Sequence, residues 1–184
     1  MLTREQTKKL LRLARNSIET YFSKTDIDLD EYSEFDRKQG VFVTLHKDGD
    51  LRGCIGFPYP TKILKDAVFE AARAAAFEDP RFPELEEDEL KEIDIEISVL
   101  TPLEELDCDA DECIARINIG EDGLILQSPL TSGLLLPQVF TEYDCTPSKA
   151  LEMTCKKAGL PVHAWKDSSV KIFKFQAQIF REKE

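Results

Sequence analysis

The sequence has few of the histidine and cysteine residues that hold structural zinc. It contains two histidines, His46 and His163, far apart in the chain, and five scattered cysteines without a C-x-x-C pair. A structural zinc site usually needs closer pairs of ligands. We therefore expect no metal site and no cofactor. We also expect the thiols to be reduced and mostly buried.

Long hydrophobic runs are missing as well. A membrane-spanning helix needs about 18–20 apolar residues, and the longest apolar run, at 133–140, is interrupted by Pro137. The N-terminal stretch MLTREQTKKL has no apolar segment after its charges, as a secretory signal peptide would have. The sequence thus predicts a cytoplasmic protein that does not enter a membrane.

Basic runs and glycine-rich phosphate-binding motifs are also absent. The chain has 24 basic and 36 acidic residues, a net charge of −12. An acidic surface repels nucleic-acid backbones and anionic membranes. Neither G-x-G-x-x-G nor G-x-x-x-x-G-K-[ST] occurs. Nucleic acids and membrane surfaces are therefore disfavoured as partners, and the acidic run at 83–92 is interpreted as a solvated face.

The hydrophobic patterns that are present predict a mixture of helices and strands. Helical spacing predicts helices over 4–22, 61–77 and 147–158. Strict alternation predicts strands over 92–101 and 171–180, and residues 116–128 are expected to form a hairpin. A length of 184 residues fits one large domain or two joined lobes. Hairpins separated by helices indicate an α+β fold with antiparallel sheets.

Residues 40–56 predict a further hairpin with its turn at Asp48-Gly49. If these two residues form the turn, Leu45 faces Arg52 and Val43 faces Cys54. Arg52 and Cys54 would then lie on one face of the hairpin, because side chains alternate along a strand. A β-bulge at Gly53 would exchange the faces.

The stretch LRGCIG at 51–56 is the first candidate site. A guanidinium near a thiol favours the thiolate and lowers its pKa, and Gly53 would let a ligand or another backbone approach. The alternative is an inert cysteine that packs as a small hydrophobe, with the glycine against the alanine-rich helix. No histidine is predicted beside Cys54 to act as a base.

Two further stretches carry polar residues. Gln138 and Glu142 are four apart after Pro137, so they would share a helical face, either towards a cleft or on the surface. Asp79 and Arg81 of DPRF are interpreted as a turn with a local ion pair.

Several motifs together resemble the AMMECR domain family. LRGCIG at 51–56, DPRF at 79–82, ISVLTP at 97–102, GLLLPQV at 133–139 and CKKAGLP at 155–161 occur in the family's order. The resemblance implies a single domain, 1–184, of two interleaved lobes, each a mainly antiparallel sheet packed with helices. It also implies a cleft between the lobes near the Arg-Gly-Cys segment. A Memo-type protein and a radical-SAM protein are implied as associated proteins.

These observations support three hypotheses. The leading one is binding of a small ligand or partner protein in the interlobe cleft, where Arg52 supplies an anion-binding donor fork and Gly53, Cys54, Gln138 and Glu142 line the site. The alternative is a thiol-dependent enzyme with Cys54 as nucleophile, in a modification pathway with the Memo-type and radical-SAM proteins. The third is a purely structural interaction module.

Overall fold

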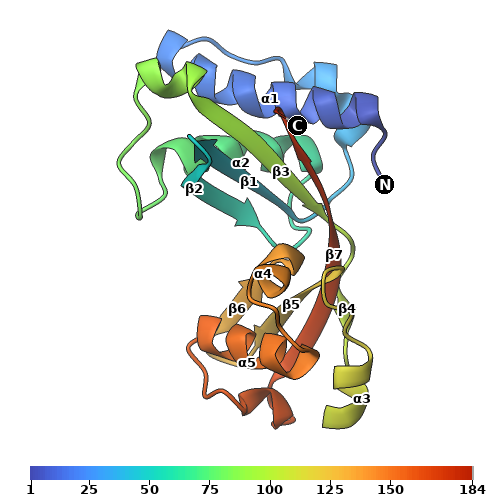
Figure 1. Ribbon diagram of the computed structural model, residues 1–184. Helices are drawn as coiled ribbons and strands as arrows, with labels where there is room; N and C mark the ends of the chain where they lie inside the picture. The colour runs from blue at the N-terminus through green and yellow to red at the C-terminus, as the bar shows by residue number, and fades with distance from the viewer. Residues whose placement is uncertain (184) are drawn as a thin grey trace. The chain divides into compact units, whose positions relative to one another are not determined.

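The computed structural model describes residues 1–183 and has an α+β fold (Figure 1). The chain divides into two compact units. The first contains residues 1–100 and the C-terminal segment that starts at Gln178, and the second contains residues 101–177. The strand β7 (Lys171–Arg181) supplies residues to both units.

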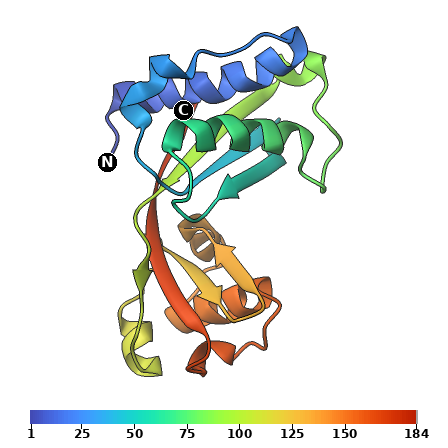
Figure 2. The ribbon, with the colours of Figure 1, turned by 180° about the vertical axis from the view of Figure 1, so that it is seen from behind.

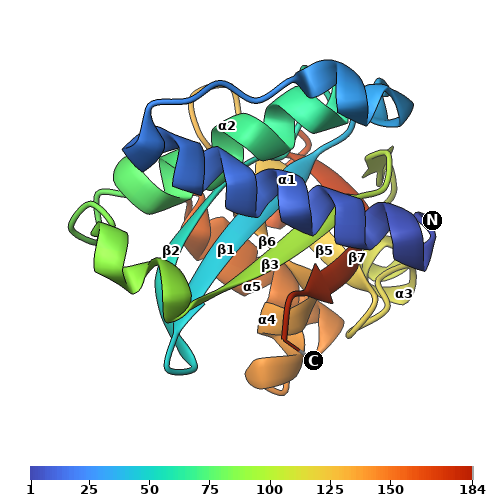
Figure 3. The ribbon, with the colours of Figure 1, turned by 90° about the horizontal axis from the view of Figure 1, so that it is seen from above.

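The first unit packs two helices against one face of an antiparallel sheet with the strand order β2-β1-β3-β7. Figure 3 shows α1 and α2 lying across these strands. The core consists of apolar side chains from both helices and from alternate strand positions such as Val43, Leu45 and Ile97. The elements of this unit are α1 (Arg4–Ser23), η1 (Leu29–Phe35), β1 (Val41–Lys47), β2 (Asp50–Phe57), α2 (Leu64–Phe77), η2 (Glu87–Lys91) and β3 (Ile93–Leu100).

The second unit has its own core around a sheet with the strand order β7-β5-β6, and β4 pairs with β7. The helix α5 covers β5 and β6, as Figure 2 shows. Besides β7, its elements are β4 (Glu104–Glu105), α3 (Ala110–Ala115), β5 (Asp122–Gln127), β6 (Ser132–Leu135), α4 (Pro137–Glu142), α5 (Pro147–Lys157) and η3 (Ala164–Lys166).

The predicted helices and alternating strands are confirmed. The first helix begins with a capping box formed by Thr3 and Gln6. The helix α5 has Pro147 in its first turn, and Gly159 follows it with a φ of +71°, which glycine adopts at little cost. The turn Asp48-Gly49 connects β1 to β2, also as predicted.

The hairpin predicted at 116–128 is wrong. Residues 122–127 form β5, which pairs instead with β6 at 132–135. The region around Gly120 is a turn that enters β5, because the Asp122 carboxylate accepts a hydrogen bond from the Asn118 amide at 2.9 Å. The connection between the two strands is organised by Ser128, whose hydroxyl accepts a hydrogen bond from the Thr131 amide.

The expectation that all thiols are reduced is wrong for one pair. Cys108 and Cys113 form a disulfide, with their Cα atoms 5.6 Å apart, whereas Cys54, Cys145 and Cys155 are free. Asp109 caps α3 by accepting hydrogen bonds from the amides of Asp111 and Glu112. The helical turn that follows brings Cys113 back to Cys108.

In the part of the chain that the structure describes, no helix combines the length and the apolar character needed to cross a bilayer.

Candidate functional site

The β1–β2 hairpin contains a β-bulge, which changes the faces on which its side chains lie. Leu45 pairs with Gly53 and Thr44 pairs with Cys54, and the register shifts between Leu45 and His46. The predicted pairs of Leu45 with Arg52 and of Val43 with Cys54 are therefore wrong. Arg52 is the extra residue of the bulge, so every position after it in β2 is displaced by one and changes face.

The side chain of Arg52 points towards η2 rather than towards Cys54. Its guanidinium makes a bidentate ion pair with Glu89, with Nε–Oε1 at 3.0 Å and Nη2–Oε2 at 2.8 Å. It also donates to the backbone oxygens of Pro83 and Glu84. These internal contacts engage Nε and both Nη atoms, in contrast to the free anion-binding fork predicted from the sequence. Arg52 is a positioning residue that holds the segment 83–89.

The ion pair has a strong effect on the titration of Glu89. Hydrogen bonds from Arg52 lower the pKa of Glu89 to about 2, and Lys47 contributes in the same direction. The hydrogen bonds that Lys47 donates to Glu92 and Glu89 in turn raise the pKa of Lys47. The carboxylate of Glu89 is thus charged throughout the ordinary pH range.

The expected ion pair between Asp79 and Arg81 is confirmed, and it also binds the backbone of Cys54. Asp79, only 5% exposed, accepts a hydrogen bond from the Cys54 amide at 2.9 Å. Arg81 donates to the Asp79 carboxylate and, at 3.2 Å, to the Cys54 carbonyl. The hydrogen bonds from Arg81 hold the pKa of Asp79 well below its usual range. Together these two side chains cover the outer edge of β2.

Gly53 allows α2 to approach the sheet closely. A Cβ atom at this position would overlap the backbone oxygen of Ala75. Of the two interpretations of Gly53 drawn from the sequence, the structure therefore shows the approach of another backbone. The side-chain-free position serves the packing of helix on strand.

The thiol of Cys54 is not activated. The Thr44 hydroxyl donates a hydrogen bond to the Cys54 sulfur at 3.3 Å. Burial raises the pKa of the Cys54 thiol, and the nearby charge of Arg81 only partly opposes this effect. A nucleophilic cysteine needs the opposite shift. The surroundings of Cys54 are those of a protonated, weakly hydrogen-bonded thiol.

Cys54 belongs to a polar face of the first sheet, on the side away from α1 and α2. Paired residues in neighbouring strands project to the same side of a sheet. Thr44 pairs with Cys54 on one side and with Glu96 on the other, and His46 pairs with Asp94. We call this set of side chains the polar face: Thr44, His46, Cys54, Asp94, Glu96 and Ser98.

The polar face contains buried groups without hydrogen-bond partners. Among the described residues, neither ring nitrogen of His46 nor the hydroxyl of Ser98 finds a partner. The Nε2 atom of His46 is 3.9 Å from Glu96, too far for a hydrogen bond, and Ser98 is only 1% exposed. An unsatisfied buried polar group costs about 1–3 kcal/mol. The unpaired groups of the polar face therefore lower the stability of the isolated chain.

The sequence did not indicate that these residues lie together. The alternation of Asp94, Glu96 and Ser98 with isoleucines is typical of a strand with one water-exposed face, yet Asp94 and Ser98 are buried. Their approach to His46 depends on the pairing of β1 with β3, two strands separated by some 45 residues. The available signal was the shared alternation of both strands, which does not reveal which strands pair.

Gln138 and Glu142 both lie on α4, in the second unit, four residues apart as expected. The Oε1 atom of Gln138 is buried without a hydrogen-bond partner among the described residues, whereas Glu142 is exposed. Arg52, Gly53 and Cys54 are adjacent on β2 in the first unit. The role of Gln138 and Glu142 in binding stays a prediction.

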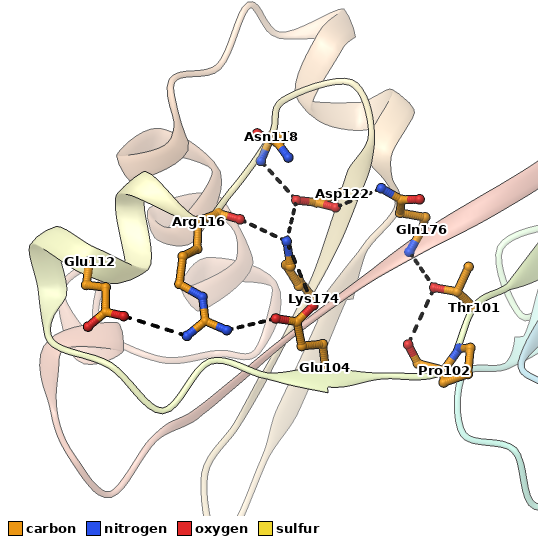
Figure 4. Close-up of polar contacts among 9 residues, drawn as sticks. All are labelled: Thr101, Pro102, Glu104, Glu112, Arg116, Asn118, Asp122, Lys174 and Gln176. Carbon is orange, nitrogen blue, oxygen red and sulfur yellow. Dashed lines mark hydrogen bonds and ion pairs between the residues drawn. The ribbon is translucent and has the colours of Figure 1, made fainter.

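A second polar cluster, in the second unit, is fully paired (Figure 4). The Asp122 carboxylate, 1% exposed, accepts hydrogen bonds from Lys174 at 3.3 Å and Gln176 at 3.4 Å, besides the Asn118 amide. Lys174 also donates to the Arg116 carbonyl at 2.9 Å. Because each buried charge has its partners, we interpret this cluster as structural.

Comparison with known proteins places these features in a common fold. A family model described as AMMECR1 matches residues 11–180. A protein of Methanothermobacter thermautotrophicus is 45% identical over 98% of this chain and 96% of its own length. Protein MJ0810 of Methanocaldococcus jannaschii is 44% identical, with 100% and 94% covered. The crystal structure of PH0010 from Pyrococcus horikoshii matches with a TM-score of 0.92 and 41% identity, over 99% of this chain and 94% of that one.

Proposed function

The chain belongs to the AMMECR1 family, and we propose that it is a binding protein whose recognition site is the polar face around Cys54. The observation that supports the proposal is the set of buried, unpaired groups on that face, His46 and Ser98. A bound molecule that completes their hydrogen bonds recovers the free energy that they cost the isolated chain.

The chemistry of these groups indicates what is bound. A neutral imidazole offers one donor and one acceptor, and a serine hydroxyl offers both. The neighbouring acids do not supply a free negative charge, because Arg181 lies 3.0 Å from Asp94 and 3.6 Å from Glu96. We therefore propose a ligand group that donates and accepts hydrogen bonds, such as an amide, from a small molecule or a partner protein.

The residues predicted from the LRGCIG stretch take distinct parts in this proposal. Cys54 and Thr44 contribute to the polar face itself. Arg52 and Gly53 fix the position of β2: Arg52 binds Glu89 of η2, and Gly53 lets α2 pack closely. For the second unit by itself, we propose Gln138 as an acceptor for a bound group, with Glu142 as a more exposed neighbour. The raised pKa of Cys54 argues against the thiol-dependent enzyme.

The two histidines allow a direct test by nuclear magnetic resonance. His46 lies on the polar face, and the exposed His163 in the second unit is an internal control. The small-molecule fraction and the protein fraction of the cell of origin are added separately to labelled protein. Purified Memo-type and radical-SAM proteins, the partners implied by the family resemblance, are added in further experiments.

We expect a saturable shift of the His46 ring signals without a shift of His163. The shift should weaken in Ser98→Ala, which removes one proposed contact. If no addition shifts His46, or if both histidines respond equally to every addition, the polar face is not a recognition site.

A further inference from the structure

The two edges of the first unit's sheet differ in whether other residues bind their backbone. At the β2 edge, Asp79 and Arg81 bind the backbone of Cys54. At the other edge lies the C-terminal part of β7, whose pairing with β5 ends at Gln176. Within residues 1–183, no strand pairs with this outer side of β7 beyond that point.

The backbone of β7 offers hydrogen-bonding groups at this free edge. The amide of Glu182 donates to the carbonyl of Ile95 at 3.1 Å, so the backbone groups of Glu182 face β3. Successive residues of a strand direct their backbone groups to opposite sides. The amides and carbonyls of Ile179 and Arg181 therefore point away from β3. Such an edge is a template for another strand.

A groove lies at this edge, lined by residues from the first turns of α1 and from the end of β7. Arg4 and Lys8 line it from the helix, and Lys183 lines it just after the strand. Arg181 also lines the groove, but its charge is paired with Asp94 and Glu96. Among the described residues that line the groove, the one acidic residue, Glu182, is neutralised by an ion pair with Arg15. The groove is therefore cationic, in a protein whose net charge is −12.

The groove also has an apolar part. Ile179 is 41% exposed, and Leu11 and Phe180 contribute further apolar surface to the lining. Arg4 and Lys8 are exposed and form no ion pair in the described part of the chain. The groove thus combines three features that a bound strand could contact. They are free backbone groups, unpaired cations and an exposed aliphatic side chain.

We propose that this groove binds an extended acidic segment of a partner protein, which adds as a strand beside β7. The partner's backbone pairs with Ile179 and Arg181, as in other cases of strand addition. Its carboxylates contact Arg4 and Lys8, and an aliphatic side chain covers Ile179. The groove adjoins the polar face at Arg181, which pairs with Asp94 and Glu96, but neither proposal depends on the other.

The probe is a fluorescent peptide of alternating glutamate and valine, with fluorescence anisotropy measured on the full chain. We expect saturable binding that weakens with added salt, because the contacts are charged and partly exposed. A peptide of alternating lysine and valine should not bind.

Charge reversal in α1 tests the cationic contact. Lys8→Glu should weaken binding by about tenfold, since it replaces an attractive charge with a repulsive one. Arg12→Glu is the matched control, because Arg12 lies one turn further along α1, is exposed and does not line the groove. Its effect should be small by comparison.

The backbone contact is tested at Ile179. Ile179→Pro removes the outward amide and leaves the β3-facing groups in place, so binding should be lost, whereas Ile179→Thr keeps the amide and should retain most of it. Circular dichroism reports whether each variant is folded. A glutamate–valine peptide with N-methylated backbone tests the same contact on the unaltered protein and should not bind.

Several results would overturn this proposal. The acidic peptide could fail to bind, or the lysine peptide could bind as tightly as the acidic one. The acidic peptide could bind Lys8→Glu as tightly as Arg12→Glu, or the N-methylated peptide could bind as tightly as the unmodified one. Self-association of the protein that Lys8→Glu abolishes would identify a second copy of the chain as the occupant instead.

Discussion

At the scale of single residues, Arg52 and Cys54 are two positions apart in the chain and differ completely in their contacts. The guanidinium of Arg52 is bound by Glu89 and by backbone carbonyls, whereas the sulfur of Cys54 contacts the Thr44 hydroxyl on the polar face. The cation that lies near Cys54 is Arg81. One extra residue in the bulge causes this separation. Within LRGCIG, Arg52 therefore stabilises the packing of η2, whereas Cys54 belongs to the polar face.

The ion pair predicts that Arg52 matters for stability. Arg52→Ala should lower the free energy of unfolding by roughly 2–4 kcal/mol, because it leaves Glu89 without its main partner. Arg52→Lys should lie between the variant and the wild type, since an ammonium cannot make the bidentate contact. Urea denaturation measures both, with Arg12→Ala as the exposed control. Unchanged stability in Arg52→Ala would contradict the positioning role.

The raised pKa of Cys54 predicts slow alkylation. At neutral pH, folded protein should react with iodoacetamide at Cys54 more slowly than a free cysteine does, because only the thiolate reacts and its fraction is reduced. The rate should rise only at a higher pH than it does for a free cysteine, because burial raises the pKa of Cys54. Mass spectrometry of peptides locates the modified residue. Rapid alkylation at neutral pH would restore the enzyme hypothesis.

At the scale of elements, the sequence predicts the secondary structure better than the pairing. The capping box at Thr3, the proline and glycine around α5 and the Asp48-Gly49 turn are local signals in the sequence, and the structure contains each of them. The bulge at Arg52 and the pairing of β1 with β3 depend on contacts between distant residues. For this reason the sequence identified Cys54 but not its neighbours His46 and Ser98.

The close packing of α2 on β2 predicts a sensitivity at Gly53. Gly53→Ala should destabilise the protein by about 1–3 kcal/mol, because the added methyl group displaces the helix backbone at Ala75. Gly49→Asn is the control, since that site is open and asparagine tolerates its positive φ. Thermal unfolding compares the two. A Gly53→Ala variant as stable as Gly49→Asn would mean that the helix can move away at no cost.

At the scale of the whole molecule, the lowered pKa of Glu89 and Asp79 links stability to pH. The folded-state pKa of Glu89, about 2, lies below the unfolded value of 4.5. Its contribution is therefore complete above pH 4.5 and is lost as the pH falls towards 2. Asp79 acts in the same direction, because its pKa is also lowered. The segment 79–89 should thus be a site of acid sensitivity.

Glu89→Gln tests this linkage. Near neutral pH the variant should be less stable than the wild type by roughly 2 kcal/mol. The difference should shrink at about pH 3, because below pH 4.5 the unfolded wild type binds a proton at Glu89 that the folded state does not. Denaturation curves over this pH range provide the comparison. A stability difference that does not change with pH would show that the charge of Glu89 is not responsible.

The central claim, that the polar face is kept for recognition at a cost to stability, is tested most directly by the free energy of unfolding of Ser98→Ala. The hydroxyl of Ser98 is buried and unpaired, so its removal should leave the isolated protein equally stable or more stable by up to about 1 kcal/mol. A loss of more than about 1 kcal/mol would mean that the hydroxyl is hydrogen-bonded within the protein, and the claim would be contradicted.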